Sequence, residues 1–114
     1  CGAAEQAMLD IAVGLALSGK IPFVYSITPF LLWRPAETLR LYLNHENIPV
    51  KLVGGGRDKD YHIDGFSHDA SDAKQILGLF PNIKQLWPKV KGQVPKMLEL
   101  MIDDPNPYLI SLRR

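Results

Sequence analysis

The chain has little cysteine and no excess of charge of either sign. Cys1 is the only cysteine among 114 residues, which excludes an internal disulfide and a metal site built from several thiolates. The net charge is +1, from 13 basic and 12 acidic residues, and this balance favours neither nucleic acid nor an anionic membrane as a partner. The sequence also lacks a membrane-length apolar run of about 18 residues and a secretory leader. We therefore expect a cytoplasmic protein.

The remaining composition is that of a globular domain, with 46% hydrophobic and 22% charged residues and no low-complexity segment. A length of 114 residues suits one domain, which we assign to residues 1–114. The sequence begins on Cys1 rather than methionine, directly before a helix-opening motif. We therefore expect it to be part of a larger domain.

Segments with helical and strand patterns alternate along the chain. The expected helices are 4–18, 28–43 with a kink at Pro35, 71–79 and 94–102, and the expected strands are 21–27, 48–53, 83–87 and 108–112. This alternation predicts a three-layer α/β fold, with a mostly parallel sheet covered by helices on both faces. Ligands of such sheets bind at the carboxyl ends of the strands.

The first expected helix is apolar almost all round, which predicts burial on more than one side. Glu5 lies in its first turn, at the edge of the expected core. The helix dipole stabilises a carboxylate there by roughly 0.3–1 kcal/mol, so a local structural role is a sufficient explanation. Catalysis is the alternative.

Three further features each allow a structural and a functional interpretation. The run 54–56 (Gly-Gly-Gly) matches neither phosphate-binding loop spacing, which favours a tight exit from a strand. His62, Asp64 and His68 match no standard metal-site spacing, so contact with a substrate or cofactor and helix capping stay open. Phe30 and Trp33 share a helical face, where they could pack in the core or stack on an aromatic ligand.

Seven short motifs follow one another along nearly the whole chain. They are 2–6 (G-A-A-E-Q), 14–16 with Gly19, 25–30 with 34–35, 49–54, 64–68 (D-G-F-S-H), 80–83 and 107–113. In this order they resemble the second part of the pyrimidine-binding domain of transketolase-like thiamine diphosphate enzymes. The resemblance implies the central-domain fold of transketolases, lacking its N-terminal helix and strand.

The resemblance assigns Glu5 to a hydrogen bond with a ring nitrogen of the cofactor's aminopyrimidine. In that family this contact favours the imino tautomer, whose nitrogen removes the thiazolium C2 proton. Phe30 matches an aromatic position that packs on the aminopyrimidine, and Ile27 and Trp33 match neighbouring pocket positions. An apolar pocket would raise the pKa of Glu5, so we expect a raised pKa.

Asp64 and His68 fall on the family's D-G-x-[ST]-H motif, which lines the substrate channel and contacts sugar hydroxyls. The resemblance therefore implies a substrate-binding role for both residues and a catalytic role for His68. At one position the chain departs from the family, because Gly56 stands where a loop histidine is usual. We expect no metal ligands in this chain.

The sequence contains no G-D-G motif followed by N-N, the family's diphosphate and magnesium motif. The resemblance thus implies that a separate diphosphate-binding domain or subunit holds Mg²⁺ and shares thiamine diphosphate with this chain. We expect a dimer or higher oligomer that transfers a ketol unit, and no activity from the isolated chain. The alternatives are a non-catalytic interaction module or truncated remnant of the same fold, and an unrelated flavodoxin-like binding domain.

Overall fold

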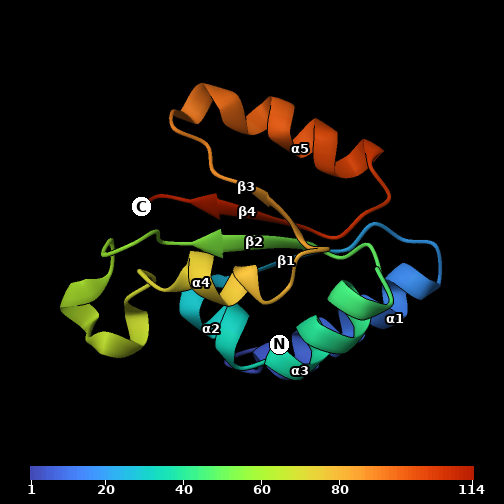
Figure 1. The fold of residues 1–114 in the computed structure, drawn as a ribbon, viewed down its shortest axis with the longest axis horizontal. Coiled ribbons are helices and arrows are strands. Elements are labelled where there is room, and N and C mark those ends of the chain that lie inside the picture. Colours follow the sequence, from blue (N-terminus) through green and yellow to red (C-terminus); the bar gives the residue numbers. More distant parts are fainter.

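A four-stranded sheet forms the centre of the computed structural model, which describes residues 1–114 (Figure 1). The strands are β1 (Phe23–Ile27), β2 (Lys51–Gly55), β3 (Lys84–Leu86) and β4 (Tyr108–Leu112). They are all parallel and lie in the order β1-β2-β4-β3. The predicted parallel α/β fold is confirmed.

Helices cover both faces of the sheet (Figure 1). One face carries α1 (Glu5–Leu17), α2 (Thr28–Trp33), α3 (Ala36–Thr38) with the π-helix Leu39–His45 that continues it, and α4 (Ala73–Gly78); the other carries α5 (Val94–Asp103). Pro35 lies between α2 and α3, at the predicted kink, because proline supplies no N–H for the helical ladder. No helix combines the length and hydropathy that a membrane crossing requires.

The hydrophobic core lies mainly between the sheet and the four-helix face. This cluster contains 16 buried residues, among them Leu9 from α1, Leu32 from α2 and Leu77 from α4. A smaller cluster on the other face joins Met101 of α5 to Tyr108 and Ile110 of β4. The central strands β2 and β4 are buried on both faces, which explains their nearly continuous apolar pattern, whereas the edge strand β1 exposes Phe23 and Tyr25.

The expectation that α1 is buried on more than one side is wrong. Leu9 and Val13 are buried, whereas Ile11, Leu15 and Leu17 have exposed fractions of 56%, 45% and 68%. The helix packs with one face against β1 and α3, and its other apolar face has no cover within this chain.

Strand β2 lies further along the sequence than predicted. Residues 48–50 precede it, and Gly54 and Gly55 belong to it, because they pair with Ser26 and Ile27 of β1. Gly56 follows with a φ of +79°, a left-handed conformation that other residues rarely adopt. The predicted tight strand exit is therefore confirmed at Gly56.

Candidate functional site

Glu5 is the first residue of α1, and its side chain is only 7% exposed. Both carboxylate oxygens are held: Ser26 Oγ, near the end of β1, donates to Oε1 over 2.9 Å, and Arg34 Nη1 lies 2.6 Å from Oε2. The order of elements brings these groups together, because β1 ends beside the start of α1 and α2 begins at once.

The pKa of Glu5 lies below its ordinary value. The hydrogen bond from Arg34 is the main cause, and burial, which favours the neutral form, is outweighed. The expected raised pKa was therefore wrong, since the pocket contains a guanidinium as well as apolar groups. At neutral pH Glu5 is an ionised hydrogen-bond acceptor.

Phe30 and Glu5 share a neighbour, Arg34. The Arg34 guanidinium carbon is 4.0 Å from the centre of the Phe30 ring. On the Phe30 ring the imidazole of His68 packs edge-on, with ring centres 4.9 Å apart and planes at 73°. The structure thus brings together three of the predicted site residues, Glu5, Phe30 and His68, although they come from three segments far apart in the sequence.

Two predicted residues lie at the margin of this group. Ile27 is half-buried at the end of β1. Trp33 is 57% exposed, and its indole Nε1 donates to Asp72 Oδ2 over 3.3 Å. Because Phe30 contacts His68 and Trp33 contacts Asp72, both aromatic side chains face the later part of the long loop, residues 56–72, which connects β2 to α4.

The long loop separates its titratable residues. Asp64 is exposed and its carboxylate makes no hydrogen bond, and the His62 ring contacts the Lys59 carbonyl oxygen over 2.7 Å. The His68 ring contacts Ser67 Oγ through Nδ1 over 3.0 Å. No three histidine, cysteine, aspartate or glutamate side chains converge on one point.

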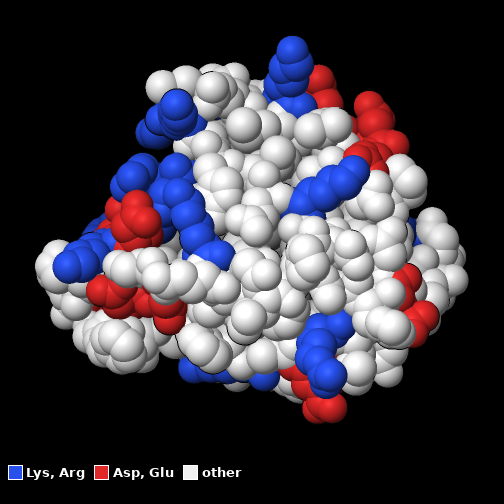
Figure 2. All heavy atoms as spheres, viewed as in Figure 1, with Lys and Arg blue, Asp and Glu red and all other residues white.

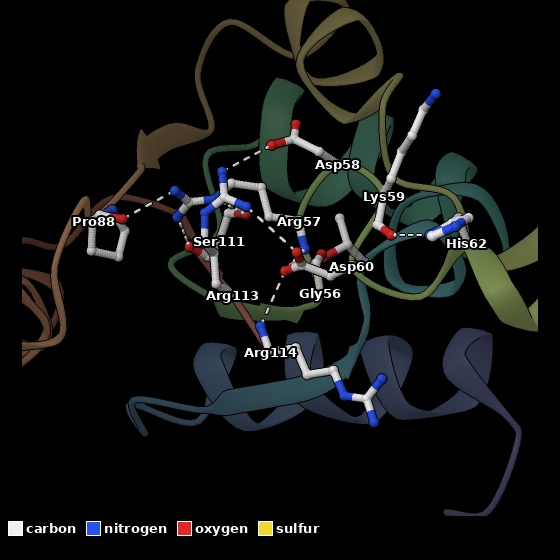
Figure 3. Close-up of polar contacts among 11 residues, drawn as sticks. Gly56, Arg57, Asp58, Lys59, Asp60, His62, Pro88, Ser111, Arg113 and Arg114 are labelled. Atoms are coloured by element: carbon white, nitrogen blue, oxygen red, sulfur yellow. Dashed lines mark hydrogen bonds and ion pairs between the residues drawn. The ribbon is translucent and has the colours of Figure 1, made fainter.

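A second polar cluster at the carboxyl end of the sheet was not predicted. The buried guanidinium of Arg57 donates to Ser111 Oγ over 3.2 Å, to the Ser111 carbonyl and to the Pro88 carbonyl over 3.0 Å (Figure 3). These bonds join the ends of β2 and β4 to the segment that follows β3. A single arginine after glycines carries no sequence signal for such a role.

Charges of both signs surround that cluster. Arg113 pairs with Asp58 and Asp60 at 3.2 and 3.4 Å (Figure 3). In Figure 2 acidic side chains lie among the basic ones that gather near the C-terminus. The cations at this edge are therefore partly neutralised.

Arg34 and Ser26 are the site residues that sequence reasoning missed. Both lie in motifs of the family resemblance, without an assigned role. The spacing of four residues between Phe30 and Arg34 was the available signal, since residues four apart meet on a helical surface. Pro35 obscures that signal, because a proline directly after Arg34 indicates that the helix breaks there.

The fold and the site define a parallel α/β domain with a buried carboxylate and an aromatic ring at the carboxyl end of its edge strand. The family model described as "Transketolase, pyrimidine binding domain" matches residues 1–114, the whole chain. The chain belongs to this family, and the resemblance drawn from its motifs is confirmed.

Curated relatives include transketolase subunits. Over 114 residues the chain is 31% identical to an apulose-4-phosphate transketolase subunit of Phocaeicola vulgatus, covering all of this chain and 36% of that protein. Over 113 residues it is 28% identical to a 6-deoxy-6-sulfo-D-fructose transketolase subunit of a Clostridium species, covering 99% of this chain and 35% of that protein. The chain thus spans about a third of the length of these relatives.

Solved structures share the fold. A split-gene transketolase described as an inactive beta4 tetramer matches with a TM-score of 0.84 and 25% identity, over 97% of this chain and 35% of that one. A transketolase from Leishmania mexicana matches with a TM-score of 0.86 and 22% identity, over 96% of this chain and 16% of that one.

Proposed function

We propose that this chain supplies the pyrimidine-binding half of a thiamine diphosphate-dependent, transketolase-like enzyme. The observation that carries the proposal is the arrangement of ionised, buried Glu5 beside the half-buried Phe30 ring, in a chain of this family. Relatives that are named as single subunits of transketolases support a split arrangement, in which a separate subunit completes the enzyme.

The residues present fit an aminopyrimidine. Each oxygen of Glu5 accepts one hydrogen bond within the chain. Since an ionised carboxylate offers about four lone-pair sites, Glu5 keeps acceptor capacity for a ring N–H. Phe30 offers an apolar ring to pack against a heterocycle. When bound, thiamine diphosphate would supply stabilisation of carbanionic charge for transfer of a two-carbon ketol unit.

Each residue then has a defined task. Glu5 holds a proton at the ring nitrogen by accepting its hydrogen bond, and Phe30 orients the ring, with Ile27 and Trp33 at the margin of the pocket. His68 uses Nδ1 for Ser67, while Nε2 has no hydrogen bond within the chain and can contact a substrate hydroxyl. Asp64, exposed on the same loop, is the second proposed substrate contact.

The diphosphate and its Mg²⁺ are assigned to the partner, because this sequence has no G-D-G…N-N motif. Such a division places the active site between two subunits, so the assembly is a dimer or a higher oligomer. It also means that the isolated chain is inactive. A cytoplasmic location stays a prediction.

The test is Glu5→Gln in the complex assembled from the full-length chain and its diphosphate-binding partner. Loss of the carboxylate should lower turnover by about 10²–10⁴-fold, the range for removal of a proton-handling group. Glu37→Gln is the matched control, because Glu37 is exposed on α3 and makes no hydrogen bond. Size-exclusion chromatography should show unchanged assembly for both variants.

Equal turnover of the Glu5→Gln and unaltered complexes would contradict the proposal. The alternative, a non-catalytic module of the same fold, predicts assembly with the partner without binding of thiamine diphosphate. The flavodoxin-like alternative is set aside, because the chain belongs to the pyrimidine-binding family. Calorimetry with the chain, the partner and the complex separates the enzyme from the non-catalytic module.

A further inference from the structure

Arg34 occupies the position between α2 and Pro35, and its side chain turns back toward the start of α1. This side chain is 44% exposed, whereas that of its partner Glu5 is 7% exposed. A half-exposed arginine that reaches a buried carboxylate over 2.6 Å forms a charge-assisted contact, which is stronger than a neutral hydrogen bond.

The same guanidinium makes a second, different contact. Its central carbon lies 4.0 Å from the centre of the Phe30 ring, a distance at which a cation is attracted to an aromatic face. Arginine suits both contacts, because its planar group can stack on a ring while its N–H groups donate sideways. Arg34 is thus the one side chain that touches both Glu5 and Phe30 through polar or cation–π contacts.

We infer that Arg34 is a positioning residue of the cofactor site, which fixes the Glu5 carboxylate relative to the Phe30 ring and keeps Glu5 a hydrogen-bond acceptor for the aminopyrimidine. This inference rests on the proposed function. Arg34 acts through Glu5 and Phe30, because its guanidinium is already engaged by both.

The contact between Arg34 and Glu5 also affects how many protons are taken up when the cofactor binds. Arg34 is the only charged side chain in contact with Glu5, and Ser26 donates to its other oxygen, so Glu5 is ionised before the cofactor arrives. An aminopyrimidine is a weak base and is mostly unprotonated between pH 6 and pH 8. A hydrogen bond between its ring nitrogen and a carboxylate requires one proton, so binding must take a proton up from solvent. The lowered pKa of Glu5 agrees with this balance.

Removing Arg34 weakens the preference of Glu5 for the ionised form. Burial, which favours the neutral acid, then opposes only the hydrogen bonds from Ser26 and the backbone, so the pKa of Glu5 rises. At pH values near that pKa Glu5 would carry its own proton more often, and cofactor binding would take up less. A residue with only a structural role would not change the number of protons taken up.

The experiment is isothermal titration of thiamine diphosphate with Mg²⁺ into the cofactor-free complex, in buffers of different ionisation enthalpy between pH 6 and pH 8. The unaltered complex is compared with Arg34→Met, Arg34→Lys and Arg40→Met. Arg40 lies on the neighbouring π-helix, is exposed and makes no ion pair, so its substitution controls for loss of one positive charge. Circular dichroism and size-exclusion chromatography report folding and assembly.

We expect Arg34→Met to weaken binding about tenfold or more, the scale of a lost hydrogen bond to a charged group. We also expect it to reduce proton uptake, most at the acidic end of the pH range. Arg34→Lys should retain proton uptake, because its charge remains, and recover only part of the affinity. Arg40→Met should match the unaltered complex.

Any one of four results would overturn the inference. Equal affinity and proton uptake for Arg34→Met and Arg40→Met would remove the positioning role while leaving the proposed function intact. Tighter binding by Arg34→Met would mean that Arg34 occupies the aminopyrimidine's place. If Arg34→Met fails to fold, the Arg34→Lys variant provides the test. Proton uptake by Arg34→Lys that is lower than in the unaltered complex would contradict the inference. No binding by the unaltered complex would refute the proposed function, and the inference with it.

Discussion

At the scale of single residues, Gly56 determines how the chain leaves β2. Its φ of +79° disfavours any side chain, and an added Cβ would overlap with ring carbons of Tyr61. The preceding Gly55 lies against the hydroxyl end of Tyr25. The Tyr61 ring therefore fills the space beside the backbone of Gly56.

We expect Gly56→Ala to lower the free energy of unfolding by on the order of 2–4 kcal/mol, since it combines a left-handed conformation with a steric overlap. Gly19→Ala is the control, because Gly19 has a similar φ of +81° with open space around it, and it should cost only about 1–2 kcal/mol. Urea unfolding followed by circular dichroism measures both. Equal losses of unfolding free energy in the two variants would show that the Tyr61 ring moves aside without an energetic cost.

Thr28 begins α2, a place where threonine often caps a helix, but its side chain makes no capping bond. Its buried hydroxyl donates instead to the Gly56 carbonyl over 2.7 Å and lies 3.2 Å from that of Gly55. The helix start is therefore tied to the end of β2 across the sheet.

At the scale of elements, α1 is apolar on nearly all sides of its sequence but buries only one side. Leu9 faces the core and is fully buried, while Leu15 on the same helix is 45% exposed. Apolar side chains on the uncovered face gain little from folding of this chain, since they stay in contact with water. The contrast gives a direct test of the one-sided packing.

Leu9→Ala should cost about 2–5 kcal/mol of unfolding free energy through lost burial and a cavity. Leu15→Ala should cost less than about 1 kcal/mol, as expected of an exposed position without a special contact. Chemical denaturation of both variants at low protein concentration gives the comparison. Similar costs would indicate that the outer face of α1 is covered in solution.

At the scale of the whole molecule, polar clusters hold the sheet at both ends of its strands. Arg57 joins β2, β4 and the segment after β3 at the carboxyl end. At the amino end Asp104 accepts from Lys84 Nζ over 2.6 Å and from the Tyr108 hydroxyl over 2.7 Å. Buried Lys51 donates to the Asp104 carbonyl over 2.7 Å. These specific polar contacts help to fix the register of the strands, because apolar contacts between strands are less directional.

The amino-end cluster predicts how stability depends on pH. The hydrogen bond from Lys84, then that from Tyr108, lowers the pKa of Asp104 well below its ordinary range. Because the folded-state pKa is lower than the unfolded one, the stabilisation is present above about pH 4 and lost as the pH falls through the folded-state value. Glu5 has a lowered pKa as well and adds to the same acid loss.

Asp104→Asn should therefore lower stability at pH 7 and flatten the decline between about pH 5 and pH 2. Asp103→Asn is the matched control, because Asp103 is exposed and makes no side-chain hydrogen bond. Urea midpoints measured across this pH range provide the comparison. An acid decline in Asp104→Asn as steep as that of the unaltered chain would contradict the assignment.

The sequence by itself determined the alternation of helices and strands, the parallel sheet and the family, since these follow from local apolar patterns and ordered motifs. It also pointed to Glu5, Phe30 and His68, because each of them occupies a defined position in one of these motifs. It could not show that Arg34 links Glu5 to Phe30, that Arg57 ties three strand ends together, or that one face of α1 stays uncovered. Those features depend on contacts between residues distant in sequence, which only the tertiary structure decides. For the same reason the pKa of Glu5 was predicted in the wrong direction: burial could be inferred from the apolar helix, but the guanidinium beside it could not.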